Sequence, residues 1–121
     1  MKVCHVFRAA SLFVLSAATA FAQDNAPAGN VKAGQQVYKA VGCWQCHGTL
    51  GQGGGPAGPR IAPTALPFAA YLQQLRVPQN AMAPYEPKIL SYKQAADIYA
   101  FLKSVPAAKP VAEIPLLNDL K

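Results

Sequence analysis

Proline and glycine limit this chain to short stretches of regular structure. The 121 residues include 11 prolines and 9 glycines, and a proline inside a helix or an inner strand interrupts it. Apolar residues make up 52% and charged residues 13%, so the chain is not a charge-driven disordered polymer. Its length allows one domain. We therefore expect a small domain of short segments and loops, and we exclude a barrel or a doubly wound sheet.

Residues 1–22 have the features of a secretion signal. Lys2 and Arg8 come first, residues 9–18 are almost wholly apolar, and residues 20–22 form the small-x-small triplet that signal peptidases cleave after. The apolar run is shorter than the roughly 20 residues that a membrane-spanning helix needs. An uncleaved amphipathic anchor is the alternative. We expect a secreted protein without a stable membrane span, located in a bacterial periplasm.

Cleavage after Ala22 would leave few residues that can carry redox or metal chemistry. Nine Lys and Arg would face five Asp and Glu, a net charge of +4, and the remaining cysteines, histidine and methionine would be Cys43, Cys46, His47 and Met82. The basic residues form no run of like charge, so nucleic-acid binding is not expected. No carboxylate pair and no nucleophile–base set is present, so no catalytic residue is predicted.

Apolar residues at helical spacing predict three helices in the exported part. The first runs from Val31 to Gly42 with Asn30 as its N-cap. The second covers residues 67–76. The third begins with an S-x-x-Q capping box and covers residues 91–105. Because no strand-like alternation of useful length occurs, the predicted fold class is all-α.

The remaining segments are predicted to be irregular. Residues 23–30 are expected to form a flexible leader before a domain that covers residues 31–105. Glycine and proline predict a loop at residues 48–63, and three prolines interrupt residues 77–88. The prolines of residues 106–121 are expected to keep this C-terminal tail out of regular helix.

The sequence Cys43-Trp44-Gln45-Cys46-His47 is the C-x-x-C-H signal for covalent attachment of c-type haem. Two thiols at this spacing can add to the two vinyl groups of a porphyrin, and the adjacent histidine can ligate the iron. A thioredoxin-like pair would follow a strand in a βαβ pattern, which is missing here. A structural zinc site needs four ligands, and the motif offers three. A pair of inert cysteines is the remaining alternative.

Other motifs occur around C-x-x-C-H in an order similar to that of a known family. A helix with Gly34 and Tyr38 precedes it, Gly58-Pro59-x-Ile61 follows it, and a helix with Ile98 and Phe101 ends the domain. Over residues 31–105 the chain resembles the class I monohaem cytochrome c family. The resemblance implies a small all-α domain whose three short helices and long loops surround one haem c, attached through Cys43 and Cys46.

The resemblance also implies roles for single residues. Gly34 and Tyr38 would cross Ile98 and Phe101. The carbonyl of Pro59 would accept a hydrogen bond from Nδ1–H of the iron ligand His47, which fixes the ring and raises its basicity. Ile61 stands where the family usually has leucine.

Met82 is the expected second axial ligand of the iron. The exported chain has no second histidine, and Met82 is its sole thioether. Its context, Ala81-Met82-Ala83-Pro84-Tyr85, resembles the M-P-P-Y stretch that carries the axial methionine in many bacterial members of the family. The alternatives are a lysine ligand, a five-coordinate iron, or a methionine that fills a gap in the core.

These features predict a one-electron carrier rather than an enzyme. The expected partners are redox proteins, a dehydrogenase as donor and a downstream acceptor, with the protein acting as a free shuttle or as a subunit of an oxidoreductase complex. A partner subunit could dock at the haem edge or on the tail, whose residues 114–117 are otherwise expected to fold back over the domain. The rival functions are a five-coordinate haem enzyme or gas sensor, and a thiol–disulfide oxidoreductase.

Overall fold

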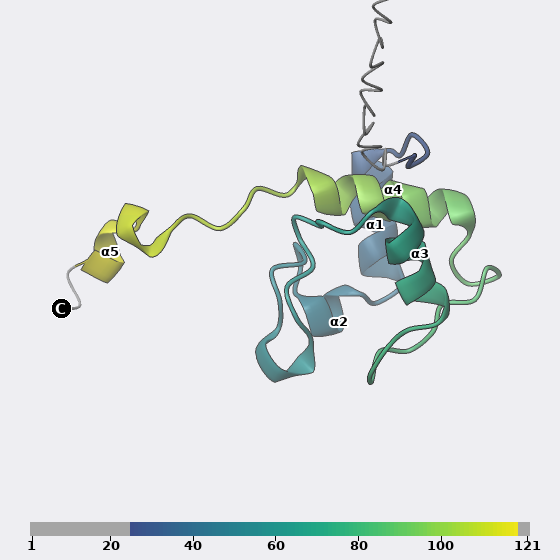
Figure 1. Cartoon of the computed structure of the whole chain (residues 1–121), viewed down its shortest axis with the longest axis horizontal. Coiled ribbons are helices and arrows are strands. Elements are labelled where there is room, and N and C mark those ends of the chain that lie inside the picture. The colour runs from purple at the N-terminus through teal and green to yellow at the C-terminus, as the bar shows by residue number, and fades with distance from the viewer. Residues whose placement is uncertain (1–24, 119–121) are drawn as a thin grey trace, which may run out of the picture.

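Figure 1 shows the computed structural model of the chain, in which residues 25–118 are described. The predicted signal peptide, residues 1–22, lies outside this range. The described part contains short helices and no strand, so the all-α prediction is confirmed. In chain order the elements are α1 (Val31–Ala40), α2 (Trp44–His47), the 3₁₀ turn η1 (Gly55–Ala57), α3 (Phe68–Arg76), α4 (Tyr92–Ser104), the 3₁₀ turn η2 (Val111–Glu113) and α5 (Pro115–Asn118).

The ends of α1 follow from its flanking residues. The side chain of Asn30 accepts a hydrogen bond of 2.8 Å from the backbone N–H of Ala33, as the predicted N-cap requires. The helix ends at Ala40, two residues before the predicted end at Gly42. Gly42 has a φ of +82°, a left-handed conformation that favours glycine and turns the chain away from the helix axis.

The predicted capping box at the start of α4 is confirmed. The hydroxyl of Ser91 accepts from the backbone N–H of Gln94, and the side-chain oxygen of Gln94 accepts from the backbone N–H of Ser91 at 2.9 Å. Two of the four unpaired N–H groups of the helix end are satisfied in this way. The helix then runs for 13 residues, from Tyr92 to Ser104, and its inner face supplies much of the core.

Helices α1 and α4 cross in close contact (Figure 1). A Cβ atom on Gly34 would overlap the carbonyl oxygen of Asp97 and lie 2.9 Å from the backbone nitrogen of Ile98. Next to this contact, the rings of Tyr38 and Phe101 lie 5.4 Å apart. The predicted crossing is therefore confirmed, and it explains why a helix interior contains glycine, which disfavours helix by about 1 kcal/mol relative to alanine.

A buried carboxylate joins the two helices at the start of α1. Asp97 is only 3% exposed. One of its oxygens accepts a bond of 2.8 Å from the backbone N–H of Asn30, and the other lies 2.8 Å from Nζ of Lys93. The backbone N–H, followed by the lysine, lowers the pKa of the Asp97 carboxyl below its ordinary value. The charged form of Asp97 therefore stabilises the helix pair.

Aromatic rings attach α3 to α4. Phe68 and Tyr71 on α3 each have their ring centroid 5.2 Å from that of Tyr99 on α4. The hydroxyl of Tyr99 donates a bond of 2.7 Å to the carbonyl of Leu66, just before α3. These contacts hold α3 against the helix pair, and Tyr71 also lines the cavity described below.

Both ends of the described chain are predicted to be irregular. Residues 23–30 are predicted to form a flexible leader; in its described part, residues 25–30, Ala26 packs against the core and Gly29 lies against Ala96 of α4. In the tail, the prediction that prolines prevent regular helix is wrong. Pro110 precedes η2 and Pro115 is the first residue of α5, a position where the missing N–H costs nothing.

The tail extends away from the domain (Figure 1). Leu116 is 80% exposed and Leu117 is 41% exposed, so folding of residues 114–117 back over the domain, one of the two alternatives for this segment, is not observed. Between residues 25 and 118, each helix is either too short or too polar to cross a membrane.

Replacement of Gly34 by alanine should destabilise the protein. The new methyl group meets backbone of α4 rather than a movable side chain, so we expect a loss of about 2–3 kcal/mol in the free energy of unfolding. Chemical denaturation followed by circular dichroism measures it. Gln36→Ala, on the exposed side of α1, is the control and should change stability little. An unchanged midpoint for Gly34→Ala would show that the helices can separate at this point without cost.

Asp97 should make stability depend on pH in the acid range. A carboxyl whose pKa is lowered by folding stabilises the folded state above its unfolded pKa of about 3.9, and this contribution disappears as the pH falls through the folded value. The stability difference between the parent and Asp97→Asn should therefore be larger at pH 7 than near pH 3. Denaturation at the two pH values tests this, and equal differences would contradict it.

Candidate functional site

The C-x-x-C-H motif forms one helical turn, α2, which sequence periodicity did not predict. Cys43 is the N-cap of this turn, and His47 is its last residue, with its backbone N–H bonded to the carbonyl of Cys43 at 3.0 Å. The turn is held to the end of α1 by a bond of 3.1 Å from Cys43 N–H to the carbonyl of Tyr38. Cys43 is half-buried and Cys46 is exposed, and both thiols are free.

The imidazole of His47 is oriented by a carbonyl. Its Nδ1 lies 2.9 Å from the carbonyl oxygen of Pro59. A carbonyl oxygen can only accept a hydrogen bond, so this contact requires the proton on Nδ1 and leaves Nε2 unprotonated in the neutral ring. An unprotonated Nε2 is the form of histidine that ligates a metal.

The loop after α2 packs closely against the backbone of α2, and this contact brings Pro59 to the imidazole. Its backbone is bonded to the motif through Gly53 N–H and the carbonyl of His47, at 2.7 Å. A Cβ on Gly54 or Gly58 would come within 2.5 or 2.8 Å of the carbonyl oxygen of Cys46. Glycine at these two positions therefore permits the close approach that places the Pro59 carbonyl beside the ring.

Two adjoining hollows contain the residues that the sequence singles out. One, of about 430 Å³, is lined mostly by apolar side chains of α3, α4 and the loop after α2. The other, of about 710 Å³, lies beside it. Cys43, Cys46, His47, Pro59 and Met82 all line the second hollow, and all but Cys46 also line the first. The structure thus brings all five predicted site residues together from three segments of the chain.

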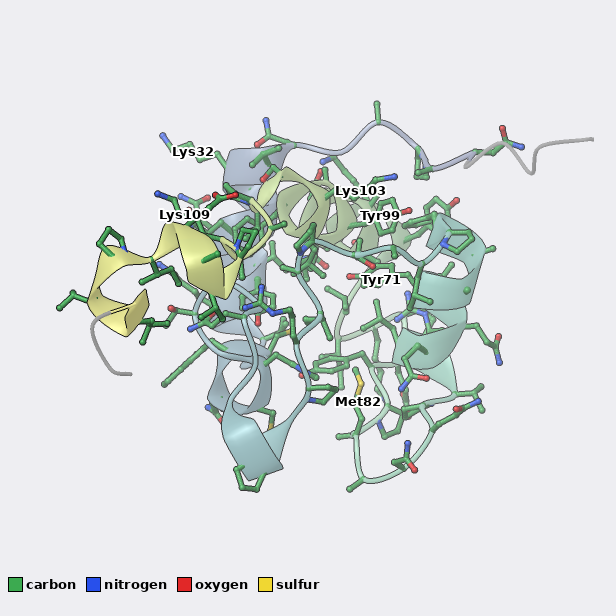
Figure 2. All side chains as sticks on the ribbon, turned by 60° about the vertical axis from the view of Figure 1, so that its left-hand side comes forward. Lys32, Tyr71, Met82, Tyr99, Lys103 and Lys109 are labelled. Carbon is green, nitrogen blue, oxygen red and sulfur yellow. The ribbon has the colours of Figure 1, made fainter. Side chains whose placement is uncertain are left out.

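Met82 reaches these hollows from the loop between α3 and α4, and its side chain points toward the middle of the domain (Figure 2). Its sulfur lies 3.7 Å from the side-chain nitrogen of Gln74 on α3, within hydrogen-bond reach of an amide donor. Sequence reasoning missed Gln74. Its place on the inner side of α3, between Tyr71 and Leu75, depends on how that helix is rotated against α4.

Tyr71 is a second residue of the site that is not among the five predicted site residues. It lines the smaller hollow, and its buried hydroxyl has no hydrogen-bond partner in the described part of the chain. Burial raises the pKa of this phenol above its ordinary value, so the group keeps its proton. A buried hydroxyl without a partner costs free energy, which points to a partner on a group that enters the hollow.

The residues present fit a haem group. Apolar walls and one unpaired hydroxyl suit a large, flat, mainly apolar molecule with polar substituents. Two free thiols can attach the porphyrin, while an imidazole with an available Nε2 and a thioether can ligate the iron, and together these are the side chains of a c-type haem site. A zinc site is not supported, since residues 25–118 contain no group of three or more His, Cys, Asp and Glu side chains able to hold a metal ion.

Comparison with known protein families identifies the family of this chain. Residues 29–102, more than half of the chain, match the family described as cytochrome c oxidase, cbb3-type, subunit III, which is a cytochrome c domain. No curated protein and no solved structure matches the chain significantly. This match agrees with the helical fold and with the residues gathered at the hollows. The chain therefore belongs to this family of cytochrome c domains, whose members carry covalently bound haem c.

Proposed function

We propose that this protein is a one-electron carrier whose haem is attached through Cys43 and Cys46 and ligated by His47 and Met82. The observation that carries the proposal is that an imidazole with its Nδ1 bonded to Pro59 and a thioether line the same hollow. When bound, the haem iron supplies a ferric–ferrous couple that takes up and releases single electrons.

The surrounding residues support this role by holding the site and limiting its access to water. The carbonyl of Pro59 orients His47 and keeps the Nδ1 proton in place. Ile98 and Leu102, both almost fully buried on α4, form an apolar wall. A soft thioether favours the reduced iron, so Met82 would raise the reduction potential, as an electron carrier requires.

The partners and location follow as parts of the same proposal. The electrons would come from a dehydrogenase and pass to a downstream redox protein. The family is named for a subunit of a cytochrome oxidase, which supports assembly into an oxidoreductase complex as an alternative to free diffusion. Secretion to a bacterial periplasm fits covalent haem attachment and the predicted signal at residues 1–22.

The rival functions have less support. A redox-active cysteine pair needs a thiol with a lowered pKa, whereas burial raises the pKa of the Cys43 thiol. A five-coordinate haem enzyme or gas sensor needs an open position at the iron, whereas the only thioether of residues 25–118 points into the hollow. Electron transfer is therefore the function that the geometry supports best.

The first test concerns attachment. The protein purified from a host that makes c-type cytochromes should keep its colour on the polypeptide after acid–acetone extraction. Its intact mass should exceed that of the polypeptide by one haem. A Cys43→Ala/Cys46→Ala variant has no thiol for the thioether bonds, and its haem should be extracted. Release of free haem from the parent would refute covalent attachment.

The second test concerns Met82. The oxidised parent should show the weak sulfur-to-iron charge-transfer band at the red end of the visible spectrum, and Met82→Ala should abolish it while the haem stays attached. Carbon monoxide should bind the reduced variant rapidly, and the reduction potential should fall because the soft ligand is lost. Lys88→Ala, at an exposed position later in the same loop and outside both hollows, is the control. If the parent lacks the band and binds carbon monoxide at once, the sensor or enzyme function takes precedence.

A further inference from the structure

The loop that carries Met82 can form few backbone hydrogen bonds to the rest of the domain. Residues 77–91 contain three prolines, Pro78, Pro84 and Pro87, which have no N–H to donate. The loop also lacks regular structure apart from isolated turns. Contacts that fix it must therefore come from a small number of residues.

Tyr85, three residues after Met82, makes three of these contacts. Its backbone N–H donates to the carbonyl of Leu75 at 2.8 Å, and its carbonyl accepts from the guanidinium of Arg76. Both partners lie on the last turns of α3. Its hydroxyl reaches the opposite way and donates to the carbonyl of Val41 at 3.1 Å.

The bond to Val41 connects the two sides of the site. Val41 is the C-cap of α1 and lies two residues before Cys43. The half-buried ring of Tyr85 lines the larger hollow together with Cys43 and Met82. Burial, with a smaller effect from Cys43, raises the pKa of Tyr85 to about 12. The phenol therefore stays protonated near neutral pH and remains a donor.

We propose that Tyr85 is a positioning residue for Met82, whose hydroxyl fastens the methionine loop to the segment that precedes the haem-attachment motif. The proposal rests on ligation by Met82, described above. The backbone and the hydroxyl of Tyr85 contact different parts of the domain. The backbone bonds hold the loop to α3, and the hydroxyl determines how closely the loop approaches His47. Loss of the hydroxyl alone should therefore free Met82 without releasing the loop from α3.

The test compares two tyrosine-to-phenylalanine variants of the complete, haem-loaded protein. Tyr85→Phe removes the bond to Val41 and the contact of the hydroxyl with the Cys43 side chain, and it leaves the ring and both backbone bonds in place. Tyr92→Phe removes a hydroxyl from an exposed tyrosine at the start of α4, away from both hollows, and is the matched control. Imidazole is added to the oxidised protein in increasing concentration, and loss of the charge-transfer band is followed by stopped flow.

At saturating imidazole the rate is that of Met82 leaving the iron, so it measures opening of the loop directly. One lost hydrogen bond should raise this rate roughly threefold to tenfold in Tyr85→Phe. When Tyr85→Phe is heated, its charge-transfer band should also disappear at a temperature well below that at which the helical circular dichroism signal is lost. Tyr92→Phe should match the parent in both measurements.

The possible results separate the two proposals. The parent protein could show the charge-transfer band while Met82 leaves the iron at the same rate in Tyr85→Phe as in the parent. This result would overturn the role of Tyr85 and leave ligation by Met82 intact. A parent without the band would overturn ligation by Met82 and the role of Tyr85 with it. Tyr85→Phe could also lower by the same amount the temperature at which the charge-transfer band is lost and the temperature at which the helices melt. In that case Tyr85 supports only the general fold, and the positioning role is overturned.

Discussion

The close contact of α1 with α4 determines where the other parts of the protein can lie. Because Gly34 has no side chain, the backbones approach until the Asp97 carboxylate can bond to the start of α1. The far end of α1 then leads directly into the C-x-x-C-H turn, while Ile98 and Leu102 of α4 form the wall that faces it. The position of the candidate haem site is thus set by two helices that lie mostly outside it.

The parts of the fold that were predictable from sequence are those with local signals. Helical spacing and the caps at Asn30 and Ser91 give the three main helices nearly to the residue. The tail was mispredicted because a proline that breaks a helix from inside can also begin one, as Pro115 does. The turn α2 was missed because four residues are too few to show a period.

The candidate site was predictable to a similar extent. Its attachment motif is contiguous, so it could be identified from sequence, and family membership supports the haem c that it predicts. The roles of His47, Met82 and Pro59 stay predictions, although the structure gathers these residues at one place. The contacts of Gln74, Tyr71 and Tyr85 could not be found from sequence because they depend on how α3 and its loop lie against distant segments.

The bond between Asn30 and Asp97 joins residues 67 positions apart, and this separation affects the order of events when the chain is made. The N-terminal helix and the two cysteines emerge first, and they have no partner until almost the whole domain has followed. Closing so long a loop is entropically costly and slow compared with forming a local turn. The thiols are therefore accessible on an unfolded chain before the helix pair can form, so an attachment enzyme can act on a flexible segment rather than on a finished domain.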